Sequence, residues 1–189
     1  MKNMFYVADE ENNRVYKFDL TFTKVKAFGS FGGGTNSFRC PIGLCFIKKY
    51  LYVCDSLNKR IQIFDVDFNF VATRNLDYNP FLIRTSYSSI VVSCSKGLYF
   101  YDLETRIIKK YHSDAKGCMS QIGSIFYVVR VIHRLYKTTF CFDADGNLIE
   151  EISMNRFGSL INGNKDGSLF CVNNILYMVS YESDKIVGM

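Results

Sequence analysis

A segment of this chain recurs at a constant offset of 46 residues. Residues 6–9, Tyr-Val-Ala-Asp, are repeated as Tyr-Val-Cys-Asp at 52–55, and residues 12–19 are repeated at 58–65. In both copies β-branched and aromatic residues alternate on either side of a polar break, which is typical of two short strands joined by a turn. A fixed offset of this size indicates one supersecondary unit that is used more than once. Because one such unit cannot bury both of its faces alone, we expect stacked β-sheets.

The residues that follow the first copy extend the pattern. They are Phe28-Gly29-Ser30, a glycine run at 32–34, and Pro41-Ile42-Gly43-Leu44. Together with the Asn-x-Arg of each copy and the strand that ends in Phe-Asp, they resemble the NHL repeat, the blade unit of a class of β-propellers. The resemblance is specific over residues 4–76 and weakens from about residue 80, where strand periodicity continues the pattern. It implies an all-β propeller built from four-stranded blades.

Strand periodicity divides the chain into five units of one predicted domain. Their approximate bounds are 1–38, 39–79, 80–117, 118–156 and 157–189. The first unit lacks a leading strand, and the third is expected to hold strands at 89–94, 98–102 and 106–108. The family is most familiar with six blades of about 40 to 45 residues each. We therefore expect either a small or open propeller of about five blades or a piece of a six-bladed one.

The cysteines indicate the setting in which the protein works. None of the seven has Cys-x-x-Cys spacing, so a structural zinc site is not expected. Cys54, Cys94 and Cys171 fall in strand-like runs, where a thiol behaves as a small buried hydrophobe. Because a signal peptide and an Asn-x-Ser/Thr sequon are also missing, we predict a reducing, cytoplasmic location. The apolar runs are too short to span a bilayer, so a membrane partner is not expected.

A charged pair recurs at the same place in the first two units. Asp9 with Arg14, and Asp55 with Arg60, flank the same predicted hairpin. The pairs could form a ring that binds a ligand, or each Arg could bond the Asp or an adjacent strand and fix the turn. The second interpretation is favoured because unpaired buried charge is scarce, and the resemblance implies the same framework role. On that role, Arg60→Ala should destabilise the protein by about 1 to 3 kcal/mol.

Residues that could carry chemistry are few. Residues 143–147 look like part of a calcium loop, but Met154 stands where the distal Glu of an EF-hand would be, so a turn is predicted. His112 and His133 are the only histidines and lack a neighbouring Cys or His. We therefore expect a protein that is not an enzyme and that has no catalytic residue, metal or cofactor. The outside alternative is a metal-dependent lyase or hydrolase, since some propellers of this general shape are lyases with metal-binding histidines.

Basic side chains provide the candidate binding face. Turns and connectors of a propeller gather on one face, and six basic residues are expected there: Arg39, Lys59, Arg60, Lys96, Arg130 and Arg134. Tyr78, Phe81 and Phe38 are expected nearby. The net charge of +5 permits an acidic ligand, and some relatives of the NHL family bind single-stranded RNA on such a surface. Acidic residues fall on the same face, which would make it an ordinary solvated surface.

The leading hypothesis is a binding scaffold for another protein. It rests on a fold of rigid blades and variable loops in which no catalytic constellation stands out. In some proteins the NHL domain selects substrates for a ubiquitin ligase, and the resemblance makes substrate recognition in such an assembly one form of this hypothesis. The ligase's zinc-binding module is not expected here, because paired Cys and His spacing is missing. Binding of single-stranded RNA is the alternative.

Overall fold

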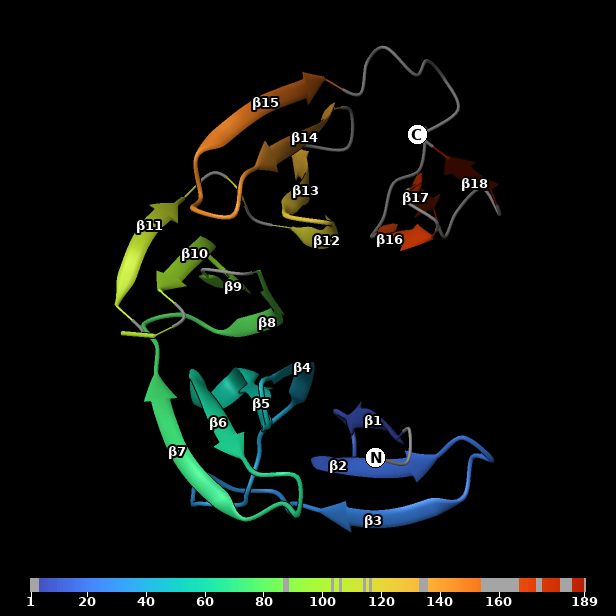
Figure 1. Cartoon of the computed structure of the whole chain (residues 1–189), viewed down its shortest axis with the longest axis vertical. Coiled ribbons are helices and arrows are strands. Elements are labelled where there is room, and N and C mark those ends of the chain that lie inside the picture. The colour runs from blue at the N-terminus through green and yellow to red at the C-terminus, as the bar shows by residue number, and fades with distance from the viewer. Residues whose placement is uncertain are drawn as a thin grey trace. The chain divides into compact units, whose positions relative to one another are not determined.

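The computed structural model describes residues 4–86, 89–102, 104–105, 107–113, 115, 117–132, 136–153, 167–172, 175–180 and 185–188. Within these ranges the chain forms five antiparallel sheets of three or four strands (Figure 1). The all-β prediction is confirmed. The chain divides into two compact units, Met1–Ile83 and Arg84–Met189. Over the same ranges, no helix has the length and apolar character that crossing a membrane requires.

The first unit contains two sheets that pack side by side through β1 and β4. The first sheet consists of β1 (Met4–Asp9), β2 (Arg14–Asp19) and β3 (Lys24–Phe28). The second consists of β4 (Pro41–Ile47), β5 (Tyr50–Asp55), β6 (Arg60–Phe64) and β7 (Phe70–Asn75), with the 3-10 turn η1 (Ser56–Asn58) between β5 and β6. The first sheet thus has one strand fewer than the second, as predicted.

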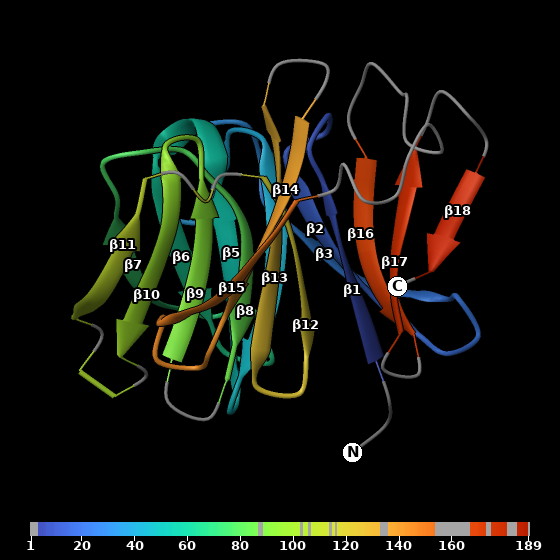
Figure 2. The same ribbon diagram turned by 90° about the horizontal axis from the view of Figure 1, so that it is seen from above.

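The second unit continues the same order of antiparallel strands (Figure 2). Its first sheet consists of β8 (Pro80–Thr85), in which the boundary between the units falls, β9 (Ser89–Cys94), β10 (Gly97–Asp102) and β11 (Ile108–His112). The next consists of β12 (Cys118–Ile122), β13 (Ile125–Ile132), β14 (Tyr136–Phe142) and β15 (Leu148–Ser153). The last consists of β16 (Gly167–Val172), β17 (Ile175–Ser180) and β18 (Lys185–Gly188). β12 packs beside β16.

The strand predicted at 106–108 is wrong, because β11 runs from Ile108 to His112. Ile107 lies just before β11, and its carbonyl accepts the Asp102 N–H at 2.9 Å; residue 106 lies outside the described residues. β11 is the outermost strand of its sheet and is largely exposed, so its polar residues do not give an apolar run. The prediction follows the apolar pair Ile107-Ile108, of which only Ile108 belongs to the strand.

A β-bulge recurs at one place in four of the described sheets. In the four-stranded sheets the register shifts between the third and fourth strands, and in the first sheet it shifts between β2 and β3. The shifts fall at residues 17/18, 63/64, 100/101 and 141/142. A bulge adds one residue to a strand and increases its twist. The repeat detected in the first 76 residues therefore continues in backbone geometry where the sequence resemblance has faded.

An aspartate follows each of these bulges and closes the next turn. Its Oδ1 accepts two backbone N–H groups of the turn, at 2.7 to 3.0 Å, in all four sheets. The four residues are Asp19, Asp65, Asp102 and Asp143. Aspartate is suited to this position because its side chain can replace a backbone acceptor within a turn. These residues mark the end of each inner hairpin and hold the outer strand in register.

An aromatic core joins the two sheets of the first unit. Phe28 of the first sheet contacts Phe64 edge to face, with ring centroids 4.7 Å apart, and stacks on Phe68 at 4.0 Å. Phe38, in the connector between the sheets, is fully buried against the same rings. Edge-to-face and offset contacts suit aromatic quadrupoles and add to the apolar area that is buried. The connector is therefore part of the core.

Candidate functional site

A hydrogen-bond network fixes the connector at residues 30–40 to the hairpin of β5 and β6. Asp55 lies at its centre and is fully buried. Its carboxylate accepts Arg60 Nε at 2.6 Å, Asn58 Nδ2 at 2.9 and 3.0 Å, and Gln62 Nε2 at 3.2 Å. The backbone N–H of Arg39, in the connector, donates to Asp55 at 2.7 Å. These donors compensate the cost of burying the carboxylate.

Arg60 extends the network along the connector. Its Nη1 donates to the Gly33 carbonyl at 2.8 Å, and its Nη2 donates to the carbonyls of Gly34 at 2.7 Å and Ser37 at 2.9 Å. The side chain is 12% exposed and is also ion-paired with Asp55. The bonds expected of a framework arginine are present. They correct the placement of Arg60 on the binding face, because its guanidinium is occupied by the protein itself.

The equivalent pair in the first sheet, Asp9 and Arg14, is arranged differently. The two residues lie opposite each other across β1 and β2. Asp9 accepts the backbone N–H and the Nδ2 of Asn12, both at 2.9 Å, and these bonds hold the pKa of its carboxyl below the usual range. Over the residues that the structure describes, Arg14 makes no hydrogen bond or ion pair. The predicted framework contact is therefore missing from this hairpin.

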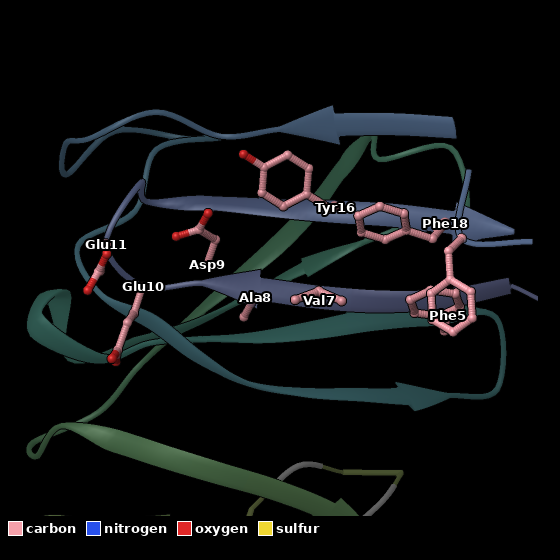
Figure 3. Close-up of a pocket in the computed structure, with 9 residues that line it drawn as sticks. Phe5, Val7, Ala8, Asp9, Glu10, Glu11, Tyr16 and Phe18 are labelled. Carbon is pink, nitrogen blue, oxygen red and sulfur yellow. The ribbon is translucent and has the colours of Figure 1, made fainter. Parts of the chain in front are cut away.

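An open hollow of about 620 Å³ lies over β1 and β2 and extends to the turn before β3 (Figure 3). Its six other side chains are those of Phe5, Val7, Ala8, Tyr16, Phe18 and Phe22, and its acidic end holds Asp9, Glu10 and Glu11. We call this surface the β1–β2 face. Figure 3 shows the three carboxylates toward one end of the strands and the rings of Phe5 and Phe18 toward the other.

The aromatic rings of the β1–β2 face contact one another. Phe5 stacks on Phe18 with centroids 5.1 Å apart and contacts Phe22 edge to face at 5.2 Å. Val7 is 41% exposed and Phe22 is 78% exposed. Such a cluster of exposed apolar side chains is typical of an interaction surface. The residue pattern alone does not predict this face, although the 46-residue offset places Phe5 and Phe18 at the positions of Leu51 and Phe64.

The predicted basic face is described only in part. Arg39 lies over the ring of Phe31 at 5.1 Å, and that ring is 69% exposed. Lys59 is exposed after η1, and Lys96 is exposed in the turn between β9 and β10 of the second unit. The side chain of Arg130, on β13, and the whole of Arg134 lie outside the described residues. That these side chains share one face stays a prediction.

The expectation that Phe38 lies near the basic face is wrong. It is fully buried in the core of the first unit, 5.6 Å from the ring of Phe28. The connector that carries it is rich in glycine and polar residues, so the sequence suggests a surface loop. The loop backbone does run at the surface, but this one side chain points inward.

Of the two histidines, His112 is held by structural contacts. The Nε2 atom of His112 lies 2.8 Å from the carbonyl oxygen of Gly146. Its imidazole ring packs against the Phe142 ring, with the two centroids 4.5 Å apart. His133 lies outside the described residues. Residues 143–147 form a turn, as predicted, with Gly146 at a φ of 80°. Over the described ranges, no group of three or more His, Cys, Asp or Glu residues could hold a metal ion.

The cysteine predictions hold where the side chains are described. Cys54 and Cys94 are buried in β5 and β9, and burial raises the pKa of the Cys94 thiol to about 12. The side chain of Cys171 lies outside the described residues. A buried thiol with such a high pKa is a packing group and is chemically inert at neutral pH.

Comparison with known proteins supports the fold. No family model and no curated protein sequence matches the chain. Among solved structures, a catalytically inactive variant of virginiamycin B lyase from Staphylococcus aureus has a TM-score of 0.72 and 10% identity, covering 99% of this chain and 66% of that one. The WD40 domain of Neurospora crassa Pan2 has a TM-score of 0.65 and 11% identity, covering 95% of this chain and 58% of that one.

BamB from Moraxella catarrhalis is a third similar structure, with a TM-score of 0.60 and 18% identity. The match covers 94% of this chain and 52% of BamB. These neighbours are β-propellers, so the predicted propeller fold is confirmed. The chain spans less than two thirds of the length of the three structures.

Proposed function

We propose that this chain is a non-enzymatic binding scaffold whose ligand is another protein. The observation that carries the proposal is the β1–β2 face, where six apolar and aromatic side chains line an open hollow. Exposed apolar clusters with a polar rim are typical of protein interaction sites. The rim here is acidic, which suits a polypeptide better than a phosphate-bearing ligand.

The rest of the molecule is consistent with this proposal. The strands present their turns on rigid sheets, and a rigid scaffold that carries variable loops is a common basis for recognition. Cys54 and Cys94 are buried as small apolar side chains, which suits the proposed cytoplasmic location. Substrate recognition for a ubiquitin ligase assembly is the narrower form of the proposal, and it rests on the resemblance to NHL repeats.

The proposal is tested by cross-linking the full chain to proteins of a cytoplasmic extract and identifying the products by mass spectrometry. Phe22→Asp places a charge in the hollow, and Leu20→Asp is its matched control. Both side chains are exposed in the turn between β2 and β3, but Leu20 does not line the hollow. We expect a specific product that Phe22→Asp removes and Leu20→Asp keeps. If both variants cross-link as the wild type does, the face is not the binding site.

RNA binding is the second candidate, and the Arg39–Phe31 pair favours it. An exposed ring next to a guanidinium can stack on a base, while Lys59 could contact a phosphate. The test is fluorescence anisotropy of the chain with a pool of single-stranded RNA at low and physiological salt. Salt-dependent binding that Phe31→Ala and Lys59→Glu weaken would support this candidate. Unchanged affinity in both variants would reject it.

A further inference from the structure

The β1–β2 face has a covered counterpart one repeat later. Phe5 pairs with Phe18 across β1 and β2, and the residues 46 positions later, Leu51 and Phe64, pair across β5 and β6. Leu51 and Phe64 are fully buried, whereas Phe5 and Phe18 are only partly buried. One surface of the repeat is therefore closed in the second copy and open in the first.

The cover of the second copy has three chemical parts. Its apolar part includes the rings of Phe28 and Phe38, whose centroids lie 4.7 and 6.0 Å from the centroid of the Phe64 ring. Its donor is the backbone N–H of Arg39, which binds Asp55. Its acceptors are the carbonyls of residues 33, 34 and 37, which bind Arg60. The connector at residues 30–40 supplies the Phe38 ring, the donor and all three acceptors.

The groups that would receive such a cover are present on the first copy. Asp9 stands at the position of Asp55 and is held by Asn12, as Asp55 is held by Asn58. Arg14 stands at the position of Arg60, and in the described part of the chain it has no hydrogen-bond partner. The apolar surface beside them is the hollow lined by Phe5, Phe18 and Phe22.

We propose that the β1–β2 face binds a loop segment of a partner protein that covers it as the connector at residues 30–40 covers β5 and β6. An aromatic side chain of the partner packs on Phe5 and Phe18. A backbone N–H of the partner donates to Asp9, and its neighbouring carbonyls accept from Arg14. This inference rests on the proposed scaffold function and specifies the partner's chemistry.

The charges of the face favour a polypeptide over an anionic ligand. Three carboxylates, those of Asp9, Glu10 and Glu11, line this end of the hollow, and one arginine, Arg14, lies opposite Asp9 across β1 and β2. A phosphate or a lipid headgroup would meet a net negative surface. Uncharged backbone donors and acceptors, in contrast, match both Asp9 and Arg14, as they match Asp55 and Arg60 in the second repeat.

The connector itself supplies the probe for a test. A fluorescein-labelled synthetic peptide with the sequence of residues 28–39 is titrated with the full chain, and its anisotropy is measured. We expect saturable binding that becomes at least about tenfold weaker with Arg14→Ala, which is a change of about 1.4 kcal/mol. Arg74→Ala is the control, since Arg74 is likewise exposed but lies on β7 of the second sheet, whereas Arg14 lies opposite Asp9 of the β1–β2 face. A peptide with Ala in place of the residue equivalent to Phe38 should bind more weakly.

Three results would overturn the inference. The first is no saturation at about 1 mM peptide, and the second is equal affinity of the wild type and Arg14→Ala. The third is a chain that is dimeric by light scattering without peptide and becomes monomeric with Arg14→Ala, because the occupant would then be a second copy. If cross-linking gives a product that Phe22→Asp removes, but the chain does not bind the peptide, only this inference is contradicted and the proposed function stands. Failure of both experiments contradicts the proposed function as well.

Discussion

Truncating Arg60 should destabilise the protein far more than truncating Arg14, although the two residues occupy the same position of the repeat. Arg60→Ala removes the ion pair with the fully buried Asp55 and the bonds to three connector carbonyls. Arg14→Ala removes a side chain that has no hydrogen bond in the described structure. The sequence does not distinguish the two arginines, so the difference tests the structural account.

The magnitude follows from what each broken bond leaves behind. A hydrogen bond to a charged group contributes about 1.5 to 3 kcal/mol, and breaking a buried ion pair typically costs about 3 to 5 kcal/mol. Asp55 keeps its bonds to Arg39, Asn58 and Gln62, and water can replace Arg60 at the exposed carbonyls of the glycines. We therefore expect a loss of about 2 to 3 kcal/mol for Arg60→Ala, against about 0.5 kcal/mol or less for Arg14→Ala.

Thermal unfolding followed by circular dichroism provides the assay. For a chain of this size 1 kcal/mol shifts Tm by roughly 2 to 4 °C, so Arg60→Ala should lower Tm by about 4 to 12 °C. Arg14→Ala should leave Tm within about 2 °C of the wild type. Equal losses in the two variants would refute the reasoning, because Arg14 would then be bonded as Arg60 is. A stable Arg60→Ala protein would remove the framework role of the network.

Three further predictions concern other parts of the fold. Gly43→Ala should destabilise the protein by about 1 to 3 kcal/mol in urea unfolding, because the added Cβ would lie 2.5 Å from the Phe81 carbonyl oxygen; unchanged stability would show that the strands can separate there. Bonds from the N–H and hydroxyl of Thr105 lower the pKa of Asp102 from 3.8 to about 2, so its stabilising effect should be complete above pH 4 and lost as the pH falls to about 2. Urea unfolding over this range should therefore vary less with pH in Asp102→Asn, and identical pH profiles would contradict the turn's role. The Cys94 thiol, with a pKa of about 12, should react with iodoacetamide only after unfolding, and labelling of the native chain at neutral pH would contradict its burial.

Most of the strand arrangement follows from the sequence, for a physical reason. Alternating aromatic and β-branched residues define the inner strands, and β9 begins and ends at the predicted residues. Outer strands are less predictable because they are half exposed and need few apolar residues, as β11 illustrates. The recurring bulges are not visible in composition, since they depend on backbone pairing between strands.

The candidate site is less accessible to sequence reasoning. The offset pairs Arg14 with Arg60 and Phe18 with Phe64, but it does not say which copy is covered. Cover depends on the connector at residues 30–40, where Phe38 points into the core and the glycine carbonyls meet Arg60. Such backbone carbonyls leave no pattern in the residue types. The β1–β2 face therefore emerges only when the two copies are compared in three dimensions.

The most direct test of the β1–β2 face as a binding surface is hydroxyl-radical footprinting with mass spectrometry, with and without the peptide of residues 28–39. Without peptide, Phe5, Phe18 and Phe22 should be oxidised much faster than the fully buried Phe64. With peptide, these three should be protected, while the exposed Phe31 should react as before. Two results would contradict the account. In one, Phe5, Phe18 and Phe22 are oxidised as slowly as Phe64 when no peptide is present; in the other, the peptide does not change their oxidation.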